Sequence, residues 1–449
     1  MSPSELRGHI FEPGAYEAGS LAGCYWAQTA PDCPDDGPVS GAAKVEFAVI
    51  GAGFTGLSAA LRLAQGGADV AVLDMHRPGW GASGRNGGFC CVGGASATSG
   101  QIRARYGATE AERFHATERA AINHVSTQIE RLGLEVDRHS RGELQLAHSP
   151  KAFAEMTRDA PDLAKRHGVE ASLIAPAELA ERGLGAAGMH GALHLDLGFA
   201  LNPRKLALGL AGAVRAAGGR IHGDSAVLEI TQADGYHVLR TTQGEIRAKH
   251  LVIATNGYSS DNVPGWLRWR YLPLQSSVLV TRPLSDAEIA AQGWSSDLMA
   301  YDSRHLLHYF RLMPDRRMLF GMRGATRWTP NALETHRRET RAHFDAMFPA
   351  WRDVEAPHFW SGLLCFSREM VPFVGEMGAG SGVHGAFAYH GNGVAMANWC
   401  GDQLARRLLG QASDLPQFFS RTPKRFEMGP WRRAALPLAL VRYRVLDRL

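Results

Sequence analysis

One segment near the N-terminus constrains the fold of this chain more than any other. An apolar run over 45–50 leads into Gly-Ala-Gly-Phe-Thr-Gly over 51–56, and apolar residues then recur at helical spacing. A second apolar run, 70–73, ends at the carboxylate of Asp74. Runs of these lengths and periods predict a buried strand, a helix and a second buried strand.

The three glycines of this segment have separate tasks in such a unit. Gly51 permits a tight turn out of the strand, Gly53 lets a pyrophosphate approach the backbone, and Gly56 lets helix and strand pack closely. The helix N-terminus supplies free N–H groups and positive dipole. We therefore predict a dinucleotide site in which Asp74 accepts hydrogen bonds from ribose hydroxyls, with contacts also from Phe54, Thr55 and Met75.

The composition narrows the class of protein. The chain has 449 residues, of which 45% are hydrophobic and 20% charged, so we expect a globular protein of two domains. Its 48 basic and 44 acidic residues are too balanced to predict a nucleic-acid partner. No apolar run is long enough for a transmembrane segment, and residues 1–20 lack the apolar core of a secretion signal. We expect a cytoplasmic protein whose six cysteines are thiols.

A second glycine-rich run, Gly79–Gly88, follows the second strand closely. It resembles the flavin loop of the FAD-dependent D-amino-acid oxidase superfamily, and is most similar to the γ-glutamylputrescine oxidase-like branch. The resemblance implies non-covalent FAD, with the loop's backbone N–H groups directed at the cofactor. The residues implied are Gly81, Ala82, Ser83, Arg85, Asn86, Gly87 and Gly88.

Further segments resemble the same family in the same order. The segment 222–230 resembles a strand that contacts adenine at Val227, and 250–258 resembles the strand that returns beneath the dinucleotide. The segment 388–397 opens a helix whose N-terminus would face the flavin pyrimidine and stabilise negative charge there after reduction. Residues 25–29 resemble the N-terminal arm of the branch. The cofactor contacts implied are Ala254, Thr255, Asn256, Gly257, Gly391, Asn392, Gly393, Val394 and Ala395.

The predicted fold is α/β, with a Rossmann-like FAD-binding domain and a discontinuous α+β substrate domain on a mixed or antiparallel sheet. Residues 111–132 read as a helix, and 305–311 and 317–322 as strands of the substrate sheet. Arginines cluster among apolar residues over 432–449; we expect this tail to pack on the protein itself rather than on a membrane surface. The predicted divisions are an arm (1–39), the FAD domain (40–100, 200–265 and 360–410), the substrate domain (101–199 and 266–359) and a helical tail (411–449).

Oxidation of an amine by a flavin mainly needs positioning of the substrate, so we look for residues that line a pocket. His390 precedes the glycine pair of the last motif, and either orients substrate and transfers protons or is hydrogen-bonded in the core. On the strand 305–311, alternation places His308 on one face and Tyr309 and Arg311 on the other. If Tyr309 faces the pocket, Arg311 could pair with a substrate carboxylate. For Trp360 we favour core packing over a role as an aromatic wall that attracts an alkyl amine.

Two further kinds of chemistry are weighed and set aside. Relatives of the sarcosine oxidase type attach flavin to a cysteine, but Cys365 is too close to the comparable stretch, 367–369, and Cys90 and Cys91 have no assigned role. His305 and His308 have a local spacing without a third ligand, so no metal is predicted.

The predicted activity is FAD-dependent oxidation of a C–N bond in a small amine or amino acid. Hydride passes to flavin N5, the imine hydrolyses to a carbonyl, and O2 is reduced to H2O2. Some relatives activate oxygen with a lysine, yet Lys424 is the only lysine between Trp266 and Met428. A dehydrogenase of N-methyl or D-amino acids that passes electrons to a carrier or quinone is therefore the alternative. An FAD protein without turnover and an NAD enzyme are disfavoured, and the sequence leaves the exact substrate open.

Overall fold

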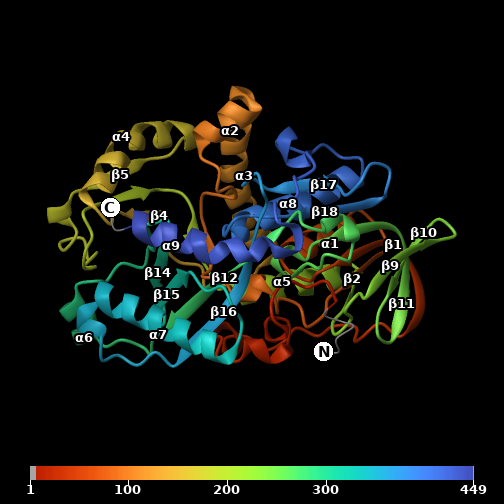
Figure 1. The fold of residues 1–449 in the computed structure, drawn as a ribbon, viewed down its shortest axis with the longest axis horizontal. Helices are drawn as coiled ribbons and strands as arrows, with labels where there is room; N and C mark the ends of the chain where they lie inside the picture. Colours follow the sequence, from red (N-terminus) through yellow and green to blue (C-terminus); the bar gives the residue numbers. More distant parts are fainter. Residues whose placement is uncertain (1–6, 448–449) are drawn as a thin grey trace.

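A computed structural model describes residues 7–447, and two eight-stranded sheets dominate it (Figure 1). The first sheet has the order β17-β18-β11-β1-β2-β8, with β10 and β9 added beside β11. Its centre, from β18 to β8, is parallel, as expected for a dinucleotide-binding unit. The strands are β1 (Gly41–Ile50), β2 (Val70–Leu73), β8 (Arg220–His222), β9 (Glu229–Ala233), β10 (Tyr236–Arg240), β11 (Gly244–Ile253), β17 (Phe373–Glu376) and β18 (Val383–Phe387).

Alternation along β1 divides the core between the two faces of this sheet. Phe47 and Val49 pack in one cluster with α1 (Phe54–Gln65), α5 (Pro203–Ala216) and α8 (Gly393–Leu408). Ala48 and Ile50 pack in the cluster on the opposite face. Helix α1 begins directly after the glycine turn, so its N-terminus lies at the carboxyl end of β1.

The second sheet has the order β16-β12-β15-β14-β13-β4-β6-β5, and all its pairs are antiparallel except β13 with β4. A mixed sheet of this kind was predicted for the substrate side, and the predicted α/β fold class is confirmed. Phe310 and Phe320 build its core with Phe344 and Trp351. The strands are β4 (Glu143–Leu146), β5 (Ala171–Ile174), β6 (Ala192–Leu195), β12 (Leu272–Val280), β13 (Met299–Asp302), β14 (His308–Leu312), β15 (Met318–Arg323) and β16 (His358–Phe366).

The remaining elements connect and cover the sheets (Figure 1). A short ribbon pairs β3 (Phe89–Cys90) with β7 (Phe199–Ala200). The helices are α2 (Ser99–Tyr106), α3 (Ala108–Leu132), α4 (Pro150–His167), α6 (Asp286–Gln292) and α7 (Pro330–Met347).

Several elements differ from the sequence-based expectations. The strand predicted over 222–230 ends at His222, because Asp224 has φ +50° and the chain turns to donate from Ser225 N to Asp74 O (2.7 Å). Helix α3 shares the core of α1 and α8 through Phe114 and Val125, although its residues were assigned to the substrate domain. Conversely, β16 pairs with β12 in the second sheet, although residues from 360 onward were assigned to the FAD domain. The division into domains stays a prediction.

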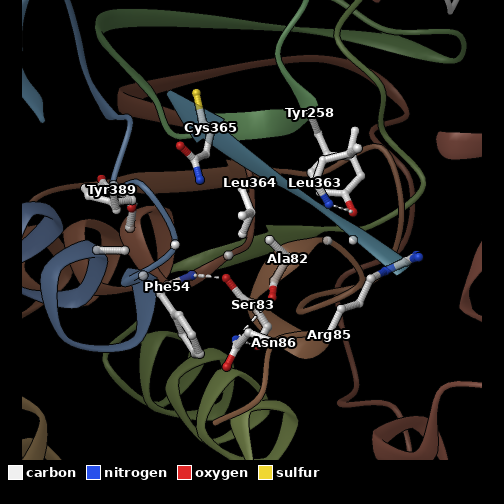
Figure 2. A pocket seen from close by; sticks show the side chains of 18 of the residues that line it. Phe54, Ala82, Ser83, Arg85, Asn86, Tyr258, Leu363, Leu364, Cys365 and Tyr389 are labelled. Carbon is white, nitrogen blue, oxygen red and sulfur yellow. Dashed lines mark hydrogen bonds between the residues drawn. The ribbon is translucent and has the colours of Figure 1, made fainter. Parts of the chain in front are cut away.

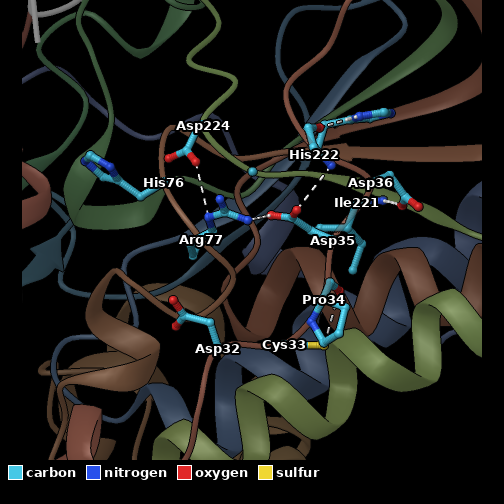
Figure 3. A network of polar contacts seen from close by, with 12 residues as sticks. Asp32, Cys33, Pro34, Asp35, Asp36, His76, Arg77, Ile221, His222 and Asp224 are labelled. Atoms are coloured by element: carbon cyan, nitrogen blue, oxygen red, sulfur yellow. Dashed lines mark hydrogen bonds and ion pairs between the residues drawn. The ribbon is translucent and has the colours of Figure 1, made fainter.

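The N-terminal arm is tied to the dinucleotide-binding side by acidic residues (Figure 3). Asp35 pairs with Arg77 at 2.8 Å, and Arg77 lies 3.1 Å from Asp224. Asp36 accepts from Ile221 N at 2.7 Å and so caps the edge strand β8. These contacts fix the loop that follows β2, next to Asp74. Residues 1–6 of the predicted arm lie outside the described residues.

The C-terminal tail departs from the predicted packing. Helix α9 (Leu436–Leu446) contributes Leu436 to a small cluster with Leu272 and Phe366, but Leu438 is 76% exposed and Trp431 just before the helix is 73% exposed. The expectation of a stripe buried on the protein is therefore wrong for most of the helix. Within residues 7–447, no helix combines the length and apolar character needed to cross a bilayer. Residues 448–449 of the predicted tail lie outside the described part.

Candidate active site

A cavity of about 450 Å³ extends from the carboxyl ends of the first sheet to one face of the second (Figure 2). A ligand bound here would touch both sheets, which is where binding sites of two-part α/β enzymes commonly lie. Most of the predicted cofactor residues line this cavity: Gly51, Gly53, Phe54, Thr55, Asp74, Met75, Gly81, Ala82, Ser83, Arg85, Asn86, Gly87, Val227, Ala254, Thr255, Asn256, Gly391, Asn392, Gly393 and Val394.

Four predicted cofactor residues are not in the cavity lining: Gly56, Gly88, Gly257 and Ala395. The three glycines instead allow close contact between backbone segments. A Cβ on Gly56 would collide with the carbonyl oxygen of Gly51, and one on Gly88 with that of Leu201. A Cβ on Gly257 would lie 2.7 Å from the carbonyl oxygen of Leu363. These glycines do not touch the cavity, but they let the backbone segments that form its wall pack closely together.

The glycine turn and the flavin loop are joined at their first contact. Ser83 Oγ accepts a hydrogen bond of 2.9 Å from Phe54 N, at the start of α1, as Figure 2 shows. A Cβ on Gly53 would lie 2.8 Å from the same Ser83 oxygen. Only a glycine therefore leaves backbone exposed to a ligand at this point.

Asp74 lies at the end of β2 in the position predicted for ribose recognition. Its carboxylate accepts hydrogen bonds from Ala52 N (2.6 Å) and His76 N (2.9 Å). Burial raises the pKa of Asp74 to about 6, against the lowering effect of these two donors. Each carboxylate oxygen has further acceptor capacity for a ribose hydroxyl.

The flavin loop is held by Arg85 and by the N-terminal arm. Arg85 donates to Trp80 O (2.7 Å), Ser20 O (2.9 Å) and Ser361 O (3.2 Å), so its guanidinium supports the loop rather than presenting free donors. From the arm, Trp26 Nε1 donates to Asn86 O at 2.9 Å. The arm resemblance over 25–29 thus corresponds to a contact with the loop.

These features fit an FAD molecule. Glycines at the turn after β1 and in the flavin loop leave backbone N–H groups uncovered, and helix α8 begins at Gly393 without a side-chain cap. Asn392 orients this helix start by donating from Nδ2 to Cys91 O (2.7 Å) and Val92 O (2.6 Å). An uncapped helix N-terminus suits the electron-rich edge of a reduced flavin.

The substrate-side wall of the cavity is a row of side chains on neighbouring strands. Tyr301 on β13 stands opposite Tyr309 on β14, and Arg323 on β15 stands opposite Ser276 on β12. All four line the cavity. The hydroxyls of Tyr309 and Ser276 are 3.0 Å apart, which fixes the Tyr309 ring.

Two predicted catalytic residues lie elsewhere. Arg311 is fully buried and is absent from the cavity lining; it donates to Gly87 O (3.0 Å), Leu201 O (2.8 Å) and His139 Nε2 (2.7 Å). With its donors used in this way, Arg311 braces the flavin loop, and the expected pairing with a substrate carboxylate is not supported. His308 faces the other side of the sheet, bound to Asp302 at 2.6 Å.

His390 does line the cavity, but both its ring nitrogens are used. Nδ1 lies 3.0 Å from Gly94 O, and Nε2 lies 3.3 Å from Ser367 N. Burial lowers the pKa of His390 to about 4, so the ring is neutral near pH 7. The geometry favours the hydrogen-bonded core histidine over the proton-transfer role.

The remaining candidates have structural contacts. Trp360 is buried and donates from Nε1 to Arg85 O at 2.8 Å, which agrees with core packing. His305 pairs with Asp447 at 2.8 Å. Cys91 and Cys365 line the cavity, and burial raises the pKa of both thiols far above their usual range. Cys90 is buried and absent from the cavity lining.

Sequence reasoning missed Arg323 and Tyr301. Arg323 lies one residue beyond the strand predicted over 317–322. Extending the alternation of that strand would have put Arg323 on the same face as Gly321, which pairs with Tyr309. Tyr301 lies on β13 (Met299–Asp302), which carries no clear period-2 signal. Its position depends on pairing with β14 and β4, which are distant in sequence.

Comparisons with known proteins agree with this arrangement. The family model described as DAO, FAD dependent oxidoreductase, matches residues 46–407. A probable oxidoreductase OrdL of Rhizobium meliloti (strain 1021) is 31% identical over 94% of this chain and 97% of its own. A gamma-glutamylputrescine oxidoreductase of Escherichia coli (strain K12) is 30% identical over 83% of this chain and 85% of its own.

Solved structures show the same fold at lower identity. Glycine oxidase from Geobacillus kaustophilus superposes with a TM-score of 0.69 at 20% identity, covering 84% of this chain and 98% of its own. L-proline dehydrogenase from P. horikoshii gives 0.68 at 18% identity, covering 85% and 97%. The resemblance found in the glycine motifs is confirmed, and with it the expectation of FAD. The chain belongs to the DAO family of FAD-dependent oxidoreductases.

Proposed function

We propose that this protein oxidises the C–N bond of an amine that also carries a carboxylate, by hydride transfer to bound FAD. The observation that carries the proposal is Arg323, a cation in the substrate end of the cavity. Its Nε atom is buried and has no hydrogen-bond partner, and no ion pair joins Arg323 to an acid among the described residues. Burial lowers the pKa of Arg323, against a smaller raising effect of Tyr309.

Arg323 is half-buried, and a buried guanidinium N–H without a partner is costly unless a ligand completes it. A carboxylate is the fitting partner, because guanidinium binds it through two parallel hydrogen bonds. Arg323 also lies against Gly391, where a Cβ would collide with its Nη2 atom. The cation is therefore adjacent to the turn that opens α8, the predicted flavin-facing helix.

FAD supplies the two-electron chemistry when bound, and this chain's residues arrange the substrate. Arg323 holds the carboxylate, while Tyr309 and Tyr301 form the wall beside it. Leu307, Leu363 and Leu364 add apolar surface to the lining, and the desolvation of a substrate bound against them would favour the neutral form of the amine. The relatives named gamma-glutamylputrescine oxidoreductase, glycine oxidase and L-proline dehydrogenase are named for compounds that carry both an amine and a carboxylate.

The test is anaerobic titration of the purified flavoprotein with matched pairs of amines, with and without a carboxylate. We expect bleaching of the flavin band by the carboxylate-bearing member at lower concentration. Arg323→Met should lower kcat/KM for that member by about 30-fold or more, from the loss of about 2 kcal/mol, and change the plain amine little. Arg323→Lys should retain part of the preference. Equal losses for both members would contradict the carboxylate role.

The electron acceptor has two candidates, O2 and a carrier or quinone. Among residues 7–447 no lysine lines the cavity. Of the two arginines in the lining, Arg85 has its donors occupied by the flavin loop and the arm, so Arg323 is the candidate to supply positive charge beside the flavin for oxygen activation. Admission of O2 to the reduced protein separates the candidates. Fast reoxidation with peroxide supports the oxidase, and fast reoxidation only with a quinone or carrier supports the dehydrogenase. A selective loss of O2 reactivity in Arg323→Met would assign that residue to the oxygen step.

A further inference from the structure

A buried carboxyl group lies directly behind the substrate-side wall. Glu143, the first residue of β4, is 5% exposed, and its Oε1 accepts a hydrogen bond of 3.2 Å from the hydroxyl of Tyr301. Its Oε2 accepts from Val92 N at 3.1 Å. Tyr301 and Val92 both line the cavity. Glu143 is thus linked to the cavity through one phenolic hydroxyl.

No ion pair joins Glu143 to a basic side chain in the part of the chain that the structure describes. The thiol of Cys91 faces it from the loop after β3, Tyr301 from β13, and Glu118 from α3. Val92 N–H and Tyr301 donate to the ionised form, whereas burial and the Glu118 carboxyl oppose it. Burial wins and raises the pKa of Glu143 to about 8. The ordinary carboxyl value is about 4.3.

We propose that Glu143 is the acceptor for the proton that a substrate ammonium must lose before oxidation, and that Tyr301 relays this proton. The inference rests on the proposed function. The ammonium N–H bond breaks and its proton goes to the Tyr301 oxygen, while the Tyr301 hydroxyl proton passes to Glu143 Oε1. Two protons each move one step, the net change is the transfer of one proton from the ammonium to Glu143, and no electrons are exchanged. The products are a neutral amine and a neutral carboxylic acid.

Two physical arguments support this direction of transfer. The substrate carries a positive charge and Glu143 a negative one before transfer, and neither afterwards, so a poorly solvated site favours the neutral pair. The acceptor is also matched to its task, because proton transfer is most effective when the acceptor titrates near the working pH. The other candidate in the wall, Tyr309, is held by Ser276, and His390 has both nitrogens occupied.

The experiment measures flavin reduction against pH in the holoenzyme by anaerobic stopped flow. For the natural protein, kcat/KM should rise tenfold per pH unit and level off near pH 8, where Glu143 ionises. In Glu143→Gln, only amine that is already neutral in solution reacts, so the acid limb should move up to the amine's own pKa of about 10. The rate at pH 7 then falls about 100-fold and recovers at high pH. Tyr301→Phe interrupts the relay and should move the limb in the same direction.

Glu118→Gln is the matched control. Glu118 is a second buried carboxyl, which accepts from the backbone of Gly93, but it does not line the cavity. Removal of the Glu118 charge should leave the acid limb of the pH profile unchanged or move it to slightly lower pH. That direction is opposite to the shift expected for Glu143→Gln. A second readout does not depend on turnover. Burial also raises the pKa of Glu118 to about 8, so the infrared difference spectra across pH 6–10 are recorded in the Glu118→Gln background. They should show a carboxylic-acid carbonyl band titrating near pH 8 that is lost when Glu143→Gln is added.

The outcomes separate this inference from the proposed function. If the natural protein is not bleached by any amine, the proposed function fails. If it is bleached but Glu143→Gln keeps its acid limb near pH 8, Glu143 is not the acceptor. If Glu143→Gln does not retain flavin, Tyr301→Phe and the infrared band of Glu118→Gln decide. An unchanged acid limb in Tyr301→Phe together with no band near pH 8 in Glu118→Gln would also overturn it.

Discussion

The two ends of the cavity are built on different principles. At the dinucleotide end, the wall is mostly backbone, supplied by glycine-rich segments within 51–56, 79–88 and 391–394. At the substrate end, the wall consists of side chains, with Ser276, Tyr301, Tyr309 and Arg323 each on a different strand. A backbone wall is specified by local glycine spacing, whereas a side-chain wall depends on how distant strands pair.

The difference extends to charge. Asp74, at the dinucleotide end, receives two backbone hydrogen bonds within its own unit. At the substrate end, Arg323 has no acid partner and Glu143 no basic partner among the described residues. In the proposed function, the substrate carboxylate pairs with Arg323 and the substrate ammonium gives its proton to Glu143. The first end is therefore preorganised for one cofactor, and the second is left electrostatically open for its substrate.

The largest effect should come from Gly56→Ala, which breaks the backbone wall. The added methyl would meet the carbonyl of Gly51, and backbone atoms cannot move aside there without displacing the turn. We expect protein purified without bound flavin, measured by the ratio of flavin to protein absorbance. Gly212→Ala on α5 is the control, since nothing lies within 4 Å of the added group. Full flavin content in Gly56→Ala would show that the turn tolerates a side chain.

Asp74→Asn should have an intermediate effect on FAD affinity. Loss of hydrogen bonds to a charged acceptor costs about 1.5–3 kcal/mol, or roughly 10–100-fold in Kd. Ribose hydroxyls donate to the ionised form, and the pKa of Asp74 without ligand is raised to about 6. Affinity of the natural apoprotein should therefore be constant above pH 6 and fall as pH drops through 6, as titrations from pH 5 to 8 would measure. Asp74→Asn should flatten this dependence; a persistent inflection at pH 6 would point to another group.

The smallest effect is expected for His390→Asn. His390 is neutral near pH 7 because burial lowers its pKa to about 4, and its contacts are neutral hydrogen bonds worth about 1 kcal/mol each. We expect kcat to fall by less than about tenfold, with the pH profile above pH 6 unchanged. A loss of the acid limb in this variant would restore the proton-transfer role and count against Glu143.

Local patterns gave good predictions wherever a feature is encoded within a few residues. The strand over 70–73 was predicted with its observed bounds, and α1 and α3 were placed within a few residues of theirs. The strand predicted over 222–230 is interrupted after His222, because Asp224 turns the chain towards Asp74, and a strand begins again only at Glu229. That turn follows from a contact across the sheet, which no local pattern carries.

The predicted substrate residues show the same limit. Alternation correctly placed Tyr309 opposite in face to His308, and Tyr309 lines the cavity. Arg311 shares its face, yet the cavity ends before it, because the flavin loop and Leu201 cover it. Which end of a strand reaches a pocket depends on what packs over the other end. Helix α9 shows the opposite error, because its apolar pattern predicted burial but most of its apolar residues after Leu436 are exposed.

The sequence by itself determined the dinucleotide fold, the family and the glycine turns, because backbone conformation and close approach are written in the spacing of glycines along one stretch of chain. Only the tertiary structure decided the substrate end. In the structure it is Arg323 that lines the cavity, while the predicted Arg311 is bonded to the flavin loop and Leu201. The same packing puts Glu143 behind Tyr301. The reason is physical: the polarity of a buried side chain acquires a function only through its neighbours, and here those neighbours come from strands far apart in sequence.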